Sequence, residues 1–130
     1  MINTIRYKMI ITLLTLNLCH WLADYTHLST DCMLEAKRFG KPLTPILAHS
    51  LVHAILFFIC VTFLHGLPEG LLASAIQLPT HFIIDVWKGR MSIWFNNLQN
   101  TSNKYYWWIF GIDQLLHQFV IIMTAYLICY

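Results

Sequence analysis

Four long apolar stretches dominate this chain and limit the structures that it can form. They cover approximately residues 9–25, 43–64, 67–87 and 105–130. An α-helix of about 20 residues is about 30 Å long, which matches the hydrocarbon thickness of a bilayer. The 130 residues are 58% hydrophobic and only 11% charged, and a soluble domain of this size cannot bury so much apolar surface. The sequence therefore predicts one integral membrane domain over residues 1–130, with the lipid bilayer as its surroundings.

The connections between these stretches predict the topology. Residues 26–42 are polar, Gly66, Leu67 and Pro68 suggest a tight turn, and residues 89–104 are rich in asparagine. Short connections favour antiparallel neighbours. We expect an all-α fold, a four-helix transmembrane bundle with up-down-up-down topology. No small-residue cleavage site follows the first stretch, so we expect it to be an uncleaved helix.

Basic residues predict the orientation of the bundle. The side opposite the long connections has only Arg6 and Lys8. The long connections carry Lys37, Arg38, Lys41, Lys88, Arg90 and Lys104. The positive-inside rule then places both long connections in the cytoplasm and both termini outside. The net charge of +2 is small, and no basic stripe is interleaved with aromatic residues, so we expect no nucleic-acid partner.

Within the apolar stretches, His and Asp residues recur in pairs separated by four positions. The pairs are His20 and Asp24, His49 and His53, His81 and Asp85, and Asp113 and His117. Residues with this spacing lie on one face of a helix, one turn apart. Such a pair can bind one ion or two neighbouring ions, as in the HExxH arrangement. Chance predicts about one pair, whereas five occur if His27 and Asp31 in the polar connection are included.

The position of each pair along its stretch predicts that the four pairs meet. The pairs lie toward the C-terminal end of the first and third stretches and toward the N-terminal end of the second and fourth. An up-down-up-down bundle brings those places to the same membrane face, the cytoplasmic one. An isolated Asp at mid-membrane costs about 2.5–3.5 kcal/mol on insertion scales, so Asp24, Asp85 and Asp113 require partners. We expect a polar His/Asp centre near one face.

We interpret these eight side chains as metal ligands. Five imidazoles and three carboxylates could supply four ligands to each of two divalent ions, and such N/O ligation suits Zn, Mn, Fe or Co. The four cysteines show no CxxC spacing and are interpreted as core residues. Three negative charges against four positive ones favour hydroxide and an anionic group such as phosphate. Alternatively, the pairs hydrogen-bond between helices or relay protons.

Three residues beside the pairs have two interpretations each. Gln114 could orient a metal ligand or bond to a neighbouring helix. Lys88 and Arg90 could hold a phosphate at the mouth of the site. The simpler interpretation is that both extend to cytoplasmic lipid headgroups.

These motifs resemble those of a family of small bacterial and phage membrane proteins, the domain-of-unknown-function 3307 family. The matching stretches are His20-Trp-Leu-Ala-Asp24-Tyr25, His49-Ser-Leu-Val-His53, His81-Phe-Ile-Ile-Asp85-Val-Trp-Lys88 and Asp113-Gln114-Leu-Leu-His117. The resemblance covers nearly the whole chain, although Tyr25 stands where the family has Phe. It implies a bacterial inner-membrane protein, and the distribution of basic residues predicts that the site faces the cytoplasm. The motifs are also distantly similar to those of membrane-bound metal-dependent hydrolases.

The leading hypothesis is a metal-dependent hydrolase of a phosphate ester, either a lipid or lipid-linked phosphate or a small anionic substrate. A dimetal centre would activate water, with Asp24, Asp85 or Asp113 as general base and Lys88 or Arg90 steadying the phosphate. Three alternatives remain. They are transport or sequestration of a divalent metal, a di-iron membrane oxidase or hydroxylase, and a non-catalytic structural or phage accessory protein. A bundle of this size could also form homo-oligomers.

Overall fold

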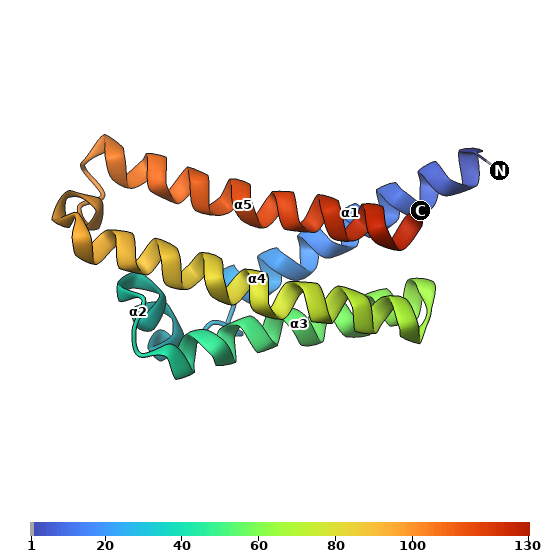
Figure 1. The fold of residues 1–130 in the computed structure, drawn as a ribbon, viewed down its shortest axis with the longest axis horizontal. Coiled ribbons are helices and arrows are strands. Elements are labelled where there is room, and N and C mark those ends of the chain that lie inside the picture. The colour runs from blue at the N-terminus through green and yellow to red at the C-terminus, as the bar shows by residue number, and fades with distance from the viewer. Residues whose placement is uncertain (1) are drawn as a thin grey trace.

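The structure, a computed structural model, describes residues 2–130 and contains helices but no strand over that range. The elements in chain order are α1 (Ile2–Tyr25), α2 (Asp31–Phe39), α3 (Leu43–His65), α4 (Leu67–Trp94), the 3-10 helix η1 (Asn96–Gln99) and α5 (Lys104–Cys129). Four of these helices are long and run roughly along one axis, with both termini at the same end of the molecule (Figure 1). The prediction of an all-α fold is confirmed.

The long helices extend beyond the apolar stretches that predicted them. Helix α1 begins at Ile2 rather than near residue 9, and α4 continues through Pro79 to Trp94 rather than ending near residue 87. The ends of the apolar stretches do not mark the ends of the helices, because a helical backbone can continue into polar sequence.

Helix α2 lies within the connection that the sequence analysis described only as polar. Thr30 caps its N-terminus, where the side chain accepts a hydrogen bond from the backbone N–H of Met33 at 3.4 Å. Gly40 ends the helix in the left-handed conformation, with φ of 62°. Asp31 in the first turn and Lys37 and Arg38 in the last turn have the charges that a helix dipole favours. Local capping therefore explains a helix of nine residues.

Helices α3 and α4 form an antiparallel hairpin, and α5 lies along α4 (Figure 1). Helix α1 closes the bundle by packing against α3 and α5, while α2 packs against α3 and α4 near their polar ends. The contact between α2 and α4 is a backbone-to-backbone approach. A Cβ added to Gly89 would lie 2.6 Å from the carbonyl oxygen of Lys37, and a Cβ added to Gly40 would lie 2.8 Å from the backbone nitrogen of Arg90. Two glycines thus allow α2 to lie directly on α4.

The interior of the bundle differs between its two ends. The end near the termini has an apolar core that includes Leu16, Phe57, Val61 and Ile121. The other half buries polar side chains, among them most members of the four His/Asp pairs. Large apolar side chains are instead exposed on the outside, as with Leu14, Ile59, Phe63, Leu115 and Phe119. The polar half therefore combines a polar interior with an apolar exterior, which is the reverse of the usual arrangement in a soluble protein.

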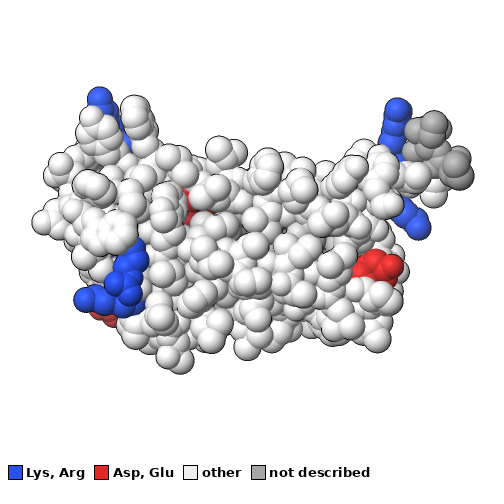
Figure 2. All heavy atoms as spheres, in the orientation of Figure 1, with Lys and Arg blue, Asp and Glu red and all other residues white. Residues whose placement is uncertain are grey.

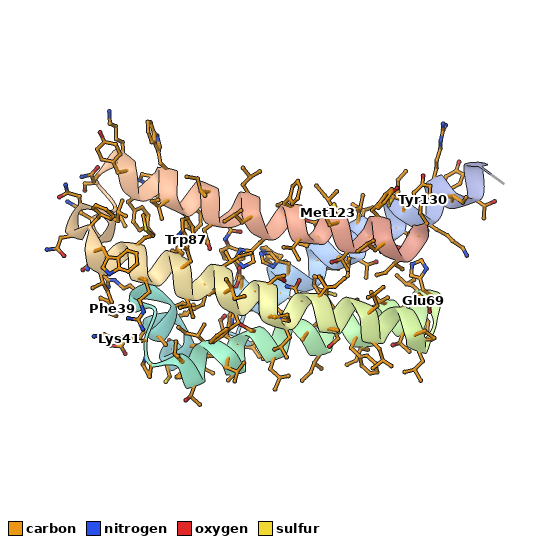
Figure 3. All side chains as sticks on the ribbon, viewed as in Figure 1. Phe39, Lys41, Glu69, Trp87, Met123 and Tyr130 are labelled. Atoms are coloured by element: carbon orange, nitrogen blue, oxygen red, sulfur yellow. The ribbon has the colours of Figure 1, made fainter. Side chains whose placement is uncertain are left out.

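Charged side chains on the outside gather at the two ends of the long axis. In Figure 2, the Lys and Arg side chains lie at the ends, and the surface between them is almost entirely uncharged. Lys41 and Glu69 mark opposite ends of the molecule in Figure 3. Within the described residues, two helices, α3 and α5, are long and apolar enough to cross a membrane, which weakly indicates a membrane protein. The prediction of four spans is therefore not confirmed.

Candidate metal centre

Each long helix directs its His/Asp pair toward the axis of the bundle. His49, His53, His81 and Asp85 are completely buried, and His20, Asp113 and His117 are between 2% and 4% exposed. Spacing by four residues places both members of a pair on the inward face of their helix. The four pairs come together in the polar half, as the sequence analysis expected, and neighbouring imidazoles such as His53 and His81 have ring centroids only 3.7 Å apart.

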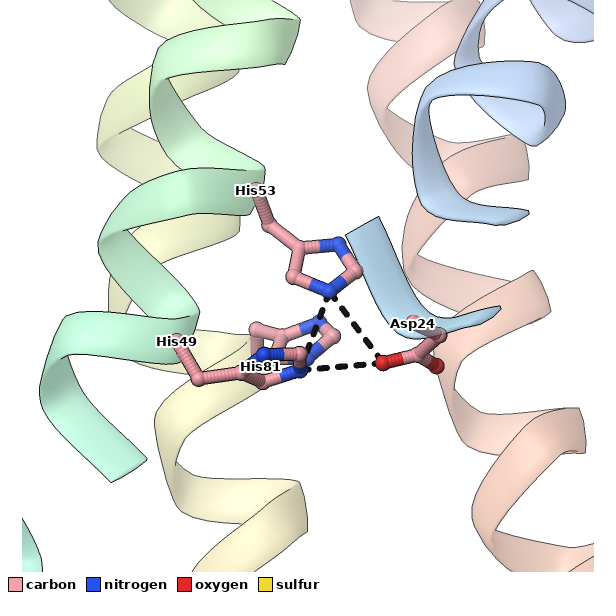
Figure 4. Close-up of side chains that lie close together, drawn as sticks. All are labelled: Asp24, His49, His53 and His81. Carbon is pink, nitrogen blue, oxygen red and sulfur yellow. Dashed lines mark hydrogen bonds and ion pairs between the residues drawn. The ribbon is translucent and has the colours of Figure 1, made fainter. Parts of the chain in front are cut away.

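The first group of potential ligands consists of Asp24, His49, His53 and His81 (Figure 4). One ligand atom from each lies within 4.8 Å of the corresponding atoms of the others. Asp24 Oδ1 is 2.9 Å from His49 Nε2 and 3.3 Å from His53 Nε2. These distances are compatible with three or four side chains around one cation.

The second group consists of His81, Asp85 and His117, so that His81 belongs to both groups. His81 Nε2 is 3.3 Å from Asp85 Oδ2, and His117 Nε2 is 3.9 Å from Asp85 Oδ1. All four of these buried atoms lack a hydrogen-bond partner in the protein. Buried polar atoms without partners are costly, and a bound divalent ion would satisfy them together.

Hydrogen bonds on the far side of three imidazoles orient their Nε2 atoms inward. His117 Nδ1 donates to the backbone carbonyl of Asp113 at 2.9 Å. Ser29 Oγ donates to the Ala23 carbonyl at 2.8 Å and can therefore accept from His49 Nδ1 at 3.1 Å. Gln77 Nε2 lies 3.2 Å from His81 Nδ1.

A neutral imidazole that donates through Nδ1 keeps its lone pair on Nε2, which is the form that binds metals. His49 and His117 are therefore held as potential ligands. His81 differs, because the Gln77 amide nitrogen donates to its Nδ1. For His81 Nε2 to keep its lone pair, the Gln77 oxygen, which has no partner, must face Nδ1 in place of the nitrogen. Neither Ser29 nor Gln77 belongs to the pattern of His/Asp pairs that predicted the site. Gln77 lies four residues before His81, so the spacing rule that found the pairs would also have identified it.

Lys37 on α2 extends into the centre, and the sequence analysis assigned it only to the basic side of the bundle. Its Nζ donates to Asp24 Oδ1 at 2.9 Å, lies 2.9 Å from His49 Nε2 and lies 3.4 Å from Asp85 Oδ2. Burial lowers the pKa of this ammonium, but the Asp85 and Asp24 carboxylates outweigh burial and raise the pKa above its ordinary value. Lys37 therefore stays charged among the potential metal ligands.

The two remaining predicted ligands, His20 and Asp113, lie beside these groups. Both ring nitrogens of His20 lack a hydrogen-bond partner, and its ring centroid is 5.1 Å from that of His117. His20 Nε2 is also 3.4 Å from Asp24 Oδ2. Asp113 belongs to neither group. Its Oδ1 is 3.7 Å from His117 Nδ1 and its Oδ2 accepts a hydrogen bond from Gln114 at 3.1 Å.

The fifth pair and Arg90 lie outside the centre. His27 and Asp31 are exposed and belong to neither ligand group, and Arg90 is exposed as well. This arrangement gives no support to a role for any of the three in metal binding.

A cavity of about 380 Å³ borders the centre on the side of α2 and η1. Asp24 and Asp113 contribute carboxylates to its wall, while Lys37, Arg38 and Lys88 contribute positive charge. The rest of the wall includes apolar and aromatic side chains such as Leu34, Leu98, Tyr106 and Phe110. An anionic group attached to an apolar one would match both parts of this wall.

Comparison with known proteins identifies one family. The family described as "Protein of unknown function (DUF3307)" matches residues 4–130. No curated protein and no solved structure matches the chain.

Proposed function

Because the chain belongs to the DUF3307 family, whose description names no activity, we propose a function from the site itself: a membrane-embedded, metal-dependent hydrolase of phosphate esters. The observation that carries the proposal is the convergence of buried His and Asp side chains from four helices beside a cavity lined with basic residues. Metal ligands next to a cationic cavity are suited to an anionic substrate.

The membrane part of the proposal rests on what the helices expose and bury. Helices α1 and α4 fall short of an apolar span because they contain buried polar residues such as His20, Gln77, His81 and Asp85. Their outer faces expose large apolar side chains, including Leu14 and Leu18 on α1 and Leu71 and Ile83 on α4. A polar interior with an apolar exterior is the arrangement expected of spanning helices. We therefore infer that all four long helices cross the membrane.

The residues divide into ligands and groups that would contact substrate. Asp85 is completely buried and does not line the cavity, so it fits a ligand rather than a general base. Asp113 lines the cavity and belongs to neither ligand group, which makes it the best-placed general base. Lys88 lines the cavity too and would hold the phosphate. A divalent ion held by the ligands would act as a Lewis acid and favour hydroxide over water.

The cavity favours hydrolysis over transport or sequestration of a metal. A water molecule takes up about 30 Å³ of liquid, so the cavity of about 380 Å³ is much larger than one ion and a few waters require. A wall that combines aromatic side chains with lysine and arginine suits an organic phosphate better than a bare cation.

Release of inorganic phosphate from a lipid phosphomonoester in mixed micelles tests the proposal. Purified protein is loaded with Zn²⁺, Mn²⁺ or Fe²⁺, and Asp85→Asn is compared with Glu69→Gln. Glu69 is the matched control because it is an acidic residue at the end of the molecule opposite to Lys41, away from the polar half (Figure 3). We expect activity in the wild type and in Glu69→Gln and at least about a 100-fold loss in Asp85→Asn, since a direct metal ligand is removed. Equal release from all three proteins, or no release with any metal, would refute the proposal.

A further inference from the structure

The two ligand groups differ in whether their nitrogen and oxygen atoms already have hydrogen-bond partners in the protein. In the first group, Asp24 Oδ1 and His49 Nε2 both lie 2.9 Å from Lys37 Nζ. In the second group, His81 Nε2, both Asp85 oxygens and His117 Nε2 have no hydrogen-bond partner. Lys37 Nζ also lies 3.4 Å from Asp85 Oδ2 of the second group. The ammonium therefore makes its short contacts of 2.9 Å only with the first group. The imidazoles of the second group and Asp85 Oδ1 have no such contact with it.

The short distance between Asp24 and His49 requires such a cation. A neutral His49 that donates through Nδ1 to Ser29, which is the form that binds metals, has a lone pair on Nε2. That lone pair and the Asp24 carboxylate are only 2.9 Å apart, although both are acceptors. Two buried acceptors at this distance repel one another unless a positive charge or a shared donor lies beside them. The Lys37 ammonium is in that position.

Charge balance leads to the same assignment. Asp24, Asp85 and Asp113 contribute three negative charges to the buried cluster, and Lys37 contributes one positive charge. One divalent ion together with Lys37 gives three positive charges, which balance the three carboxylates. Two divalent ions together with Lys37 would give five. An unbalanced buried charge is costly, so one ion is favoured.

We propose that the centre holds a single divalent ion at His81, Asp85 and His117, and that the Lys37 ammonium acts as a tethered second cation at Asp24 and His49. His20 lies between the two groups, because its ring centroid is 5.1 Å from that of His117 and its Nε2 is 3.4 Å from Asp24 Oδ2. This assignment differs from the dimetal centre expected from the sequence. It rests on the proposed function only in that a metal ion is bound.

The anchoring of α2 explains how Lys37 is kept in place. The backbones of Gly40 and Gly89 are in direct contact, so the last turn of α2 is fixed against α4 close to Asp85. A lysine on a mobile loop could leave when a second ion arrives. Lys37 on a short capped helix is held at the centre, and a second ion would have to displace it.

Metal content of the purified protein tests the inference. Wild type, Lys37→Met, Lys37→Arg and Lys41→Met are equilibrated with Zn²⁺, freed of unbound metal and analysed by elemental mass spectrometry. Lys41 is the matched control, since it is a basic, exposed residue of the same connection. We expect one ion per chain in wild type, Lys37→Arg and Lys41→Met. We expect two in Lys37→Met, where the first group loses its own cation.

If Lys37→Met does not fold, the metal content of Asp24→Asn and Asp85→Asn tests the same inference. Asp24→Asn removes a carboxylate from the group that Lys37 occupies and leaves His81, Asp85 and His117 unchanged. It is therefore expected to retain the single ion with an affinity within about 10- to 100-fold of wild type. Asp85→Asn is expected to lose the ion. Equal loss in both variants would overturn the inference.

The outcomes separate this inference from the proposed function. Two ions in the wild type, or one ion in a folded Lys37→Met, would overturn the single-ion arrangement and leave a metal-dependent hydrolase intact. No ion in any variant would overturn both. One ion in the wild type and two in Lys37→Met, without phosphate release from any ester, would support the arrangement and refute the hydrolase.

Discussion

At the scale of single residues, His81 lies where the two ligand groups meet. It belongs to both ligand groups, and its ring lies within 6 Å of those of His20, His49, His53 and His117. Its orientation depends on Gln77, one turn earlier on α4, because Gln77 Nε2 lies 3.2 Å from His81 Nδ1. A metal ligand with a polar partner on its far side loses little entropy when it binds.

Replacing Gln77 by leucine should therefore weaken metal binding without removing a ligand. We expect the affinity for Zn²⁺ in Gln77→Leu to fall by about 10- to 100-fold, which is typical when a group that orients a ligand is lost. Competition with a metal-binding dye measures this change. Thr80→Val is the control, since Thr80 bonds only to the backbone of its own helix. Equal affinities in Gln77→Leu and Thr80→Val would contradict the orienting role.

At the scale of elements, the contact between α2 and α4 decides whether Lys37 reaches the centre. Gly89 has no room for a side chain, because an added Cβ would lie 2.6 Å from the Lys37 carbonyl oxygen. Gly111 on α5 offers a contrast, since an added Cβ would meet nothing within 4 Å. The two glycines are both helical, so they differ in packing rather than in backbone conformation.

Alanine at these two positions should have opposite effects on stability. Gly89→Ala should lower the thermal midpoint of unfolding in detergent. The added Cβ would clash with backbone atoms of α2 and Gly40, which cannot rotate away as a side chain could, so α2 must move away from α4. Gly111→Ala should raise it or leave it unchanged, since alanine favours a helix over glycine by up to about 1 kcal/mol. Circular dichroism on heating measures both. A Gly89→Ala midpoint at or above that of Gly111→Ala would show that the contact between α2 and α4 is not close.

At the scale of the whole molecule, buried polar side chains fill one half of the bundle, and large apolar side chains are exposed on its outside. Phe119 is 62% exposed in the middle of α5, whereas Asn97 is an exposed residue of η1 at one end of the bundle. If the bundle spans a bilayer, these two exposed positions have different surroundings: lipid for Phe119 and water or headgroups for Asn97.

A lysine at each position tests that difference. Phe119→Lys should reduce membrane insertion, because a charged residue in the bilayer core costs about 2.5–3.5 kcal/mol on insertion scales. Asn97→Lys should insert like the wild type. The measurement is the fraction of protein that stays with membranes after an alkaline wash. Release of the wild type by the wash would contradict the membrane proposal, as would equal retention of the two variants.

Much of the candidate site could be predicted from the sequence because it depends on short-range geometry. Residues four apart on a helix share a face whatever the helix packs against. The spacing therefore predicts that the two members of each pair on α1, α3, α4 and α5 point in the same direction. Because successive helices run in opposite directions, the alternating position of the pairs along their helices then predicts that all four pairs lie at the same depth in the bundle. The same reasoning could not separate ligands from neighbours. Asp113 fits the spacing rule as well as Asp85 does, yet only Asp85 belongs to a ligand group.

Hydropathy thus determined the existence of the four long helices, and residue spacing determined the inward-facing pairs and their likeness to one family, because each depends on residues close together in the chain. Tertiary structure alone decided that Lys37, rather than Arg38 or Lys41, enters the centre. That choice depends on the register in which α2 packs against α4 through Gly40 and Gly89. Residues 49 positions apart make that contact, and no local pattern in the sequence encodes the distance between them.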